Sequence, residues 1–288
     1  MSKNESGKKL ESSFKTLWGE NVFLEVTEDD NKCLSLSKGE WSEDVERSDA
    51  PFEGEPFEHP EDYSKYDFNN FTVGISKSVK SAYGSFNCTG VLVAPRTILT
   101  AAHCLKKTKG LTITFANNNL RQTIITSKDF MIHPEFSDSK KNRSSKYDAA
   151  LIFIDRDARG FLPLEASEES PEVGDEVEMA GYGSLGRNKK TGKFIPNKRR
   201  ELDGLKAKIL RKETEKGLLI YQNDKGLSSC TGDSGGPMVE KNEDTGDFEL
   251  VGITRGPVLG DKDSEYCTYR GEYTDYQFIR DWVEDNLR

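Results

Sequence analysis

Short apolar or alternating segments, separated by turn-forming residues, dominate the chain from residue 69 onward. They include NFTVGI, TGVLVA, TILTAA, LTITFA, ALIFI, EVEMAGYG, GLLIY and LVGITR. Many short strands at this spacing are typical of an all-β sandwich or barrel. The last stretch differs because its apolar residues recur at helical spacing, which predicts a C-terminal amphipathic helix packed on the core. The residues of this stripe are Phe278, Ile279, Trp282, Val283 and Leu287.

The acidic charge is concentrated at the N-terminal end. The 288 residues carry a formal charge of −9, and residues 1–68 alone hold 18 acidic and 8 basic side chains. Such an asymmetry often marks a tail, a pro-segment or a solvated extension. We therefore expect 1–68 to be an acidic N-terminal extension or pro-segment, ending in an extended linker at PFEGEPFEHPEDYSKYD. The body, 69–288, is nearly neutral and gives no reason to expect nucleic-acid binding.

No membrane or export signal stands out. No run approaches the ~20 apolar residues that a membrane span needs, so none is predicted. The first residues, MSKNESGKKLESSF, lack the apolar stretch of a secretory signal. Either a signal is missing from this sequence, or the protein is not exported by that route.

Three segments carry residues suited to catalysis by a serine. A serine hydroxyl needs a base to take its proton, a carboxylate to orient that base, and donors for the oxyanion. LTAAHC offers His103, KYDAALIFI begins its apolar run after Asp148, and CTGDSGGPMV surrounds Ser234 with glycines that permit a tight loop. Taken singly, His103 could be structural and Asp148 a strand-start cap. The three together, in this order, are far more specific.

The three motifs resemble those of the trypsin/chymotrypsin family of serine proteases. IHPEF, GDEVEMAGYG and EYTDYQFIRDWV resemble further family segments, so the resemblance covers roughly residues 70–288. It implies two six-stranded antiparallel β-barrels with a C-terminal helix and an active site in the cleft between them. The first barrel would supply His103 and Asp148, and the second Ser234.

The resemblance also implies the role of each group. Ser234 would attack the scissile carbonyl, His103 would act as base and then as acid, and Asp148 would orient the imidazole. The N–H groups of Gly232 and Ser234 would form the oxyanion hole. Protein or peptide substrates are expected, and no metal or organic cofactor.

Four of the five cysteines match family bridges, which would join Cys88 to Cys104 and Cys230 to Cys267. Cys33 is then left unpaired. Two such bridges imply an oxidising compartment, so we expect a secreted or periplasmic protein. The cysteines form no CxxC pair, and no structural zinc site is expected.

The activation region departs from the family pattern. In the family, the residue at Asp233 pairs with a new α-amino group that cleavage releases. The corresponding segment, near residues 55–60, has no Arg-Ile or Lys-Ile junction, and Arg47-Ser48 is the nearest basic site. Either cleavage occurs at an unusual site, or Asp233 finds an internal partner and no cleavage is needed.

The substrate pocket departs as well. Ser228 stands where trypsin-like enzymes carry Asp, so no strong preference for Lys or Arg is predicted. Gly271 resembles a pocket-wall glycine that keeps the slot open. Arg255 would either point into the cleft and favour acidic substrates or be a solvated edge charge. Acidic residues on a nearby loop could restore a basic preference: Asp261, Asp263 and Glu265.

A serine endopeptidase is therefore the leading hypothesis. The alternative is a catalytically latent or inactive protease-fold binding protein, kept open by the unusual activation region. An esterase could use the same acyl-transfer chemistry, but the implied architecture associates with peptide cleavage by family analogy. The sequence indicates neither the natural substrate nor the oligomeric state.

Overall fold

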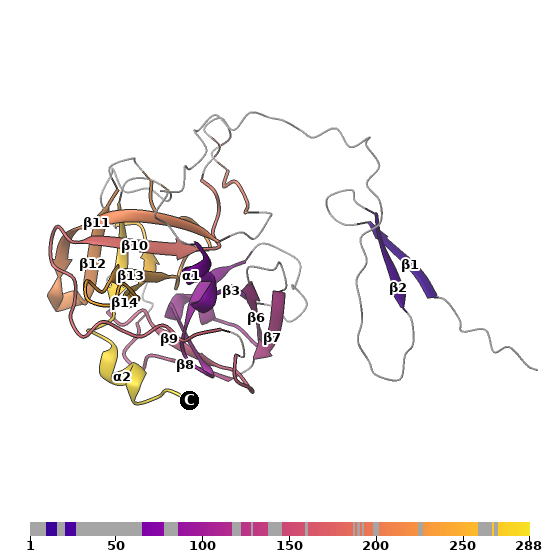
Figure 1. The fold of residues 1–288 in the computed structure, drawn as a ribbon, viewed down its shortest axis with the longest axis horizontal. Coiled ribbons are helices and arrows are strands. Elements are labelled where there is room, and N and C mark those ends of the chain that lie inside the picture. Colours follow the sequence, from indigo (N-terminus) through magenta and orange to yellow (C-terminus); the bar gives the residue numbers. More distant parts are fainter. Residues whose placement is uncertain are drawn as a thin grey trace, which may run out of the picture. The chain divides into compact units, whose positions relative to one another are not determined.

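The computed structural model describes residues 10–15, 21–26, 65–77, 86–116, 122–127, 129–137, 146–158, 161–186, 188, 191, 193–197, 202–223, 227–258, 267 and 270–288. The chain divides into two compact units, Met1–Glu58 and His59–Arg288. In the first unit, β1 (Leu10–Lys15) and β2 (Asn21–Val26) form an antiparallel hairpin. The second unit contains the other described elements (Figure 1).

Seven antiparallel strands form the first sheet of the second unit, in the order β7-β6-β3-β4-β5-β9-β8. Its strands are rich in β-branched and apolar residues, and β3, β5 and β9 are buried along their whole length. Their bounds are β3 (Thr72–Ser76), β4 (Cys88–Ala94), β5 (Thr97–Thr100), β6 (Leu111–Ala116), β7 (Gln122–Ser127), β8 (Asp129–Ile132) and β9 (Ala150–Phe153).

The two edge strands of this sheet, β7 and β8, are neighbours in sequence. Only residue 128 separates them, yet they lie at opposite ends of the strand order. At the junction, the Ser127 hydroxyl donates to the Phe153 carbonyl at 2.6 Å and accepts from the Asp129 N–H at 3.1 Å. The sheet must therefore curl until its edges meet. Counted as one bent strand, β7 and β8 complete the six strands that were predicted for this barrel.

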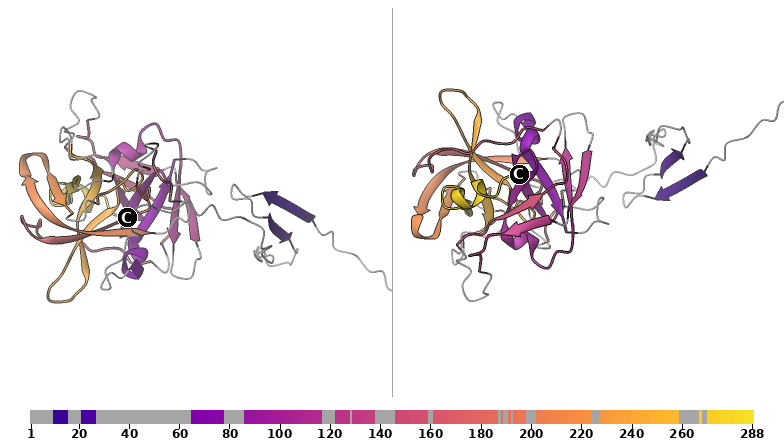
Figure 2. Two further views of the ribbon diagram at one scale, coloured as in Figure 1. Left: turned by 90° about the horizontal axis from the view of Figure 1, so that it is seen from above. Right: turned by 90° about the horizontal axis from the view of Figure 1, so that it is seen from below.

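The second sheet is a closed six-stranded barrel in the order β10-β11-β12-β15-β14-β13. The two sheets lie side by side within this unit (Figures 1 and 2). The prediction of two antiparallel barrels is confirmed. The strands are β10 (Glu176–Gly181), β11 (Asp203–Glu213), β12 (Leu218–Gln222), β13 (Pro237–Lys241), β14 (Phe248–Gly256) and β15 (Arg270–Asp275).

Where the structure is described, helices are few and short. α1 (Lys65–Phe71) begins inside the segment that was predicted to be an extended linker, and that prediction is wrong there. The chain coils at this point because Phe68 and Phe71 bury their rings in the core. The other helical segments among the described residues are the two 3-10 turns, η1 (Ala102–Leu105) and η2 (Thr214–Lys216), and the helix α2 (Arg280–Glu284).

The predicted C-terminal helix is present but shorter than its apolar stripe. Ile279 and Val283 are buried as expected, whereas Leu287 is 40% exposed. Phe278 stacks on Tyr147 of the first-sheet region, with ring centroids 4.8 Å apart. The same ring occupies the space that a side chain at Gly217, in the second-barrel region, would fill. The segment entering α2 therefore contacts both barrels.

Among the described residues, no helix combines the length and the apolar character that crossing a bilayer requires.

Candidate active site

His103 lies in η1, directly after β5. The preceding Ala101 and Ala102 are fully buried, and their small side chains let the turn pack against the first sheet. The His103 backbone N–H donates to Asp148 Oδ1 at 2.9 Å, and its ring Nδ1 lies 2.7 Å from Asp148 Oδ2. Both carboxylate oxygens of Asp148 thus accept hydrogen bonds from His103. A hydrogen on Nδ1 leaves Nε2 free to accept a proton.

Asp148 is positioned by an unusual backbone turn just before β9. Tyr147 has a φ of 62°, and the Ala149 N–H closes the turn on the Tyr147 carbonyl at 2.7 Å. A left-handed conformation costs a non-glycine residue roughly 1–2 kcal/mol. The Tyr147 ring is stacked on His133, with centroids 4.3 Å apart, as well as on Phe278. These contacts stabilise the turn that presents the carboxylate.

The Asp148 side chain is only 5% exposed. Burial by itself raises the pKa of this carboxyl. Attraction to His103 and the two hydrogen bonds from that residue oppose burial, with a smaller contribution from Arg255, and the pKa is lowered overall. The carboxylate therefore stays ionised beside the imidazole.

Ser234 lies in a tight loop before β13. Gly232 and Gly235 have φ values of 106° and 83°, and a side chain at Gly235 would overlap Thr100 of β5. The loop is closed by the Gly236 N–H on the Asp233 carbonyl at 2.8 Å. Within the described part of the chain, the N–H groups of Gly232 and Ser234 have no hydrogen-bond acceptor. Two free donors on one loop are suited to binding an anionic oxygen.

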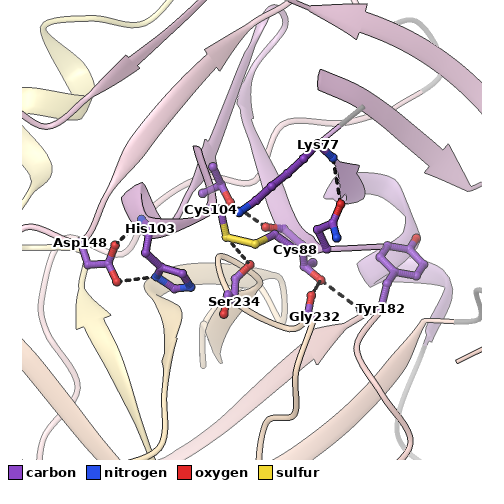
Figure 3. Close-up of a disulfide and its surroundings, with 11 residues drawn as sticks. Lys77, Cys88, His103, Cys104, Asp148, Tyr182, Gly232 and Ser234 are labelled. Carbon is purple, nitrogen blue, oxygen red and sulfur yellow. Dashed lines mark hydrogen bonds and ion pairs between the residues drawn. A yellow bond between two sulfur atoms is a disulfide. The ribbon is translucent and has the colours of Figure 1, made fainter. Parts of the chain in front are cut away.

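The imidazole of His103 lies between the Asp148 carboxylate and Ser234 (Figure 3). No hydrogen bond joins the side chains of His103 and Ser234, both of which are described residues. Catalytic hydrogen bonds of this kind are often long before substrate binds. The bridge Cys88–Cys104 lies beside both residues. Its sulfurs are within 4.8 Å of a His103 ring nitrogen, and the Cys104 sulfur is 3.6 Å from the Ser234 carbonyl oxygen.

Both expected disulfides are present, Cys88–Cys104 and Cys230–Cys267. Because the sulfurs of Cys88 and Cys104 are bonded to each other, they cannot act as thiolate ligands with the neighbouring His103. Cys33 lies outside the described residues.

The predicted pocket residue Ser228 belongs to a cluster of hydroxyl groups. Its hydroxyl donates to the Ser229 carbonyl at 3.2 Å, and the Ser229 N–H donates to the Tyr221 hydroxyl at 2.7 Å. A Cβ at Gly271 would lie 2.6 Å from that same hydroxyl, so glycine permits close packing on Tyr221. These four residues carry no charge. The acidic loop residues proposed to compensate lie outside the described residues.

Arg255 is not a solvated edge charge, because its side chain is 8% exposed and ion-paired. Its Nη1 lies 2.8 Å from Glu272 Oε2, and its Nε lies 4.0 Å from Asp148 Oδ2. The side chain of Glu272 is 9% exposed, and nothing in the sequence indicated this ion pair. The charge of Arg255 is thus already paired within the chain, which argues against its attracting an acidic substrate residue.

Comparison with known proteins agrees with this architecture. The family model described as Trypsin matches residues 62–283. The chain belongs to the trypsin family. Glandular kallikrein of Sus scrofa is 28% identical over 230 residues, covering 71% of this chain and 87% of the kallikrein. Hypodermin-B of Hypoderma lineatum is 26% identical over 219 residues, covering 70% and 78%. The solved structure of mouse neuropsin, a serine protease, aligns with a TM-score of 0.59 at 22% identity over 75% of this chain and 94% of neuropsin.

In this family member, Asp233 points to backbone amides. The Gly183 N–H donates to its Oδ1 at 2.7 Å and the Cys230 N–H to its Oδ2 at 2.6 Å. A side chain at Gly181 or Gly183 would overlap the carboxylate. The segment GYG that resembles the family's aromatic-Gly turn therefore forms a cradle for Asp233.

Sequence reasoning missed two residues that contact the candidate site, Glu272 and Thr89. Glu272 sits in a strand where a charged residue alternates with apolar ones and reads as solvent-facing. Thr89 reads as an ordinary strand residue in CTGVLVA. Local sequence carries no signal for either role, because each depends on a partner far along the chain.

Proposed function

We propose that this trypsin-family chain is a serine endopeptidase acting through Ser234, His103 and Asp148 by an acyl-enzyme mechanism. The observation that carries the proposal is the double hydrogen bond from His103 to Asp148, with the ring beside a loop that has two free N–H donors. Nucleophilic catalysis by serine requires that combination of base, orienting carboxylate and donors.

In the first half-reaction, Ser234 Oγ attacks the scissile carbonyl carbon while His103 Nε2 takes the hydroxyl proton. Asp148 accepts the hydrogen bond from Nδ1–H, stays ionised and stabilises the imidazolium. The carbonyl oxygen becomes an oxyanion that the N–H groups of Gly232 and Ser234 stabilise. His103 then gives its proton to the leaving nitrogen, the C–N bond breaks, and an acyl ester remains on Ser234.

In the second half-reaction, water replaces the amine. His103 takes a proton from water, whose oxygen attacks the ester carbon. Collapse of the second tetrahedral intermediate releases the carboxylic acid and returns the proton to Ser234 Oγ. Removing one oxyanion donor typically costs about 10²–10³ in rate, so the loop geometry is central to the proposal.

For the substrate, we propose peptides without a strong requirement for Lys or Arg beside the scissile bond. The uncharged hydroxyls of Ser228, Ser229 and Tyr221 support this, since a buried cationic side chain needs a paired charge. Secretion or a periplasmic location is part of the proposal and is supported by the two disulfides.

For activation, we propose that Asp233 needs no new chain terminus. Two backbone N–H bonds already satisfy its carboxylate, one on each oxygen. A carboxylate with such donors is stabilised in its ionised form. N-terminal sequencing of the active species tests this, because activity that appears only after cleavage at a defined site would contradict it.

The proposed activity is tested with a fluorophosphonate probe and a peptide library. Wild-type protein should label at Ser234 and cleave peptides, and Ser234→Ala should do neither. Ser184→Ala serves as the matched control, because the bond of Ser184 in this region is made by its backbone. Absence of labelling in wild-type protein, before and after limited proteolysis, would instead favour the protease-fold binding protein. Cleavage of esters but not peptides would identify an esterase.

A further inference from the structure

Thr89 is a fully buried residue of β4 that contacts the nucleophile loop twice. Its N–H donates to the Ser234 carbonyl at 2.9 Å, and its hydroxyl donates to the Gly232 carbonyl, also at 2.9 Å. The same hydroxyl accepts from the Tyr182 N–H at 3.1 Å. Its own carbonyl accepts from the Thr100 hydroxyl at 2.7 Å. Figure 3 labels Gly232 and Tyr182, the two residues whose backbone groups meet at this hydroxyl.

The direction of each hydrogen bond is fixed by its partner. A backbone N–H can only donate and a carbonyl can only accept, so the Thr89 hydroxyl must accept from Tyr182 and donate to Gly232. Valine has nearly the same shape as threonine and can do neither. Serine can do both.

The two bonds from Thr89 act on the part of the loop that carries the proposed oxyanion donors. Gly232 has no side chain to pack, and its φ of 106° is open to glycine but strained for other residues. Fixing the carbonyls of Gly232 and Ser234 restrains the peptides on both sides of the Asp233–Ser234 link. The N–H group of Ser234 lies between these two peptides, and the N–H group of Gly232 lies directly before them.

We propose that Thr89 is a positioning residue for the oxyanion hole. Its hydroxyl and its N–H connect the first barrel to the loop of the second, and so orient the donors of Gly232 and Ser234. Thr89 acts through these residues and does not itself touch substrate. This inference rests on the proposed serine-endopeptidase function.

The test compares Thr89→Val with Thr89→Ser. Thr89→Val should lower kcat by about 10- to 100-fold, because misaligned donors weaken stabilisation of the oxyanion. KM should stay within about twofold, since the change acts in the transition state, and Thr89→Ser should keep kcat within about threefold of wild type. Thr72→Val is the matched control: Thr72 is a buried threonine of the adjacent strand whose hydroxyl has no partner among the described residues.

Two measurements distinguish the role of Thr89 from the proposed serine-endopeptidase function on which it rests. The rate of Ser234 labelling by fluorophosphonate should fall in Thr89→Val and not in Thr72→Val, because the probe's P=O oxygen also needs the donors. Amide hydrogen exchange at Tyr182 should speed up in Thr89→Val, whether or not the protein is catalytic, and return to the wild-type rate in Thr89→Ser.

Each outcome has a defined meaning. An unlabelled wild type would overturn the proposed function and this inference with it. Equal labelling and kcat in wild type and Thr89→Val, or failure of Thr89→Ser to restore them, would overturn the role of Thr89 alone. If Thr89→Val does not fold, Thr89→Ala offers a smaller side chain at the same place, and the same loss of kcat is expected.

Discussion

The guanidinium of Arg255 lies 2.8 Å from the carboxylate of Glu272, and both side chains are less than a tenth exposed. The same guanidinium is 4.0 Å from Asp148. One buried cation therefore faces two carboxylates, one of which orients His103. Glu272 supplies the nearer partner and limits how strongly Arg255 draws on Asp148.

Glu272→Gln should destabilise the protein and impair catalysis. Removing one partner of a buried ion pair typically costs about 3–5 kcal/mol in the free energy of unfolding. Arg255 would then turn toward Asp148 and compete with His103, so kcat/KM should fall. Denaturant unfolding and steady-state kinetics measure both effects. The double variant Arg255→Met/Glu272→Leu should recover most of the stability, and a loss below about 1 kcal/mol in the single variant would contradict the pairing.

Asp233→Asn should slow the labelling of Ser234. An amide offers one oxygen and one NH₂ group, so either the Gly183 or the Cys230 N–H must face a donor. Leaving a buried N–H without an acceptor costs about 1–3 kcal/mol, and the nucleophile loop should shift to relieve it. Labelling rates of the intact chain measure the effect. An unchanged rate would show that the two amide bonds do not shape the loop.

Removing the bridge Cys88–Cys104 should impair catalysis as well as stability. The double change Cys88→Ala/Cys104→Ala opens a short loop and should cost about 3 kcal/mol of unfolding free energy. Activity at a temperature where the variant remains folded should also fall, because the bridge lies beside His103 and Ser234. Wild-type kinetic constants in the folded variant would refute the supporting role of the bridge.

For comparison, Cys230→Ala/Cys267→Ala opens a longer loop and should cost about 4 kcal/mol. This bridge adjoins the hydroxyl cluster at Ser228, so its removal should alter which peptides are cleaved more than the rate of labelling.

Stability should decline as the pH falls below the ordinary histidine range, and His133→Asn should flatten that decline. Burial lowers the pKa of His133 from its usual 6.5, with Glu135 opposing the shift by its charge. The unfolded chain then takes up a proton before the folded one does, so stability is lost as pH drops from about 6.5 toward the lowered folded pKa.

The contacts of His133 explain the choice of variant. The Glu135 N–H donates to His133 Nδ1 at 3.2 Å, which requires an unprotonated Nδ1, while the rings of Tyr147 and Trp282 cover the imidazole. Asparagine keeps an acceptor two residues before that N–H but does not titrate. Thermal unfolding from pH 7.5 to 5 measures the slope, and equal slopes in both proteins would exclude His133 as its source.

Much of the fold could be predicted because short strands leave a repeating pattern in the sequence. The pattern predicted an all-β sandwich or barrel and the packing of Ile279 and Val283, and the resemblance to the trypsin/chymotrypsin family implied two barrels. The pattern could not show that β7 and β8, which are neighbours in sequence, form opposite edges of one sheet. Nor could it show α1, whose position follows from the burial of Phe68 and Phe71 rather than from helix propensity.

The residues of the candidate site could be predicted from the sequence for a different reason. His103, Asp148 and Ser234 sit in motifs with local constraints, namely small residues, a strand start and glycines. Thr89 and Glu272 have no such local mark. Thr89 bonds to a residue 143 positions away and Glu272 to one 17 positions away. Their roles can therefore be recognised only in the folded structure.

The groups proposed for catalysis come from both barrels, and Thr89 of β4 donates two hydrogen bonds to the loop that carries Ser234. The proposed hydrolysis would thus depend on how the two barrels are aligned, and the buried core that they share holds that alignment.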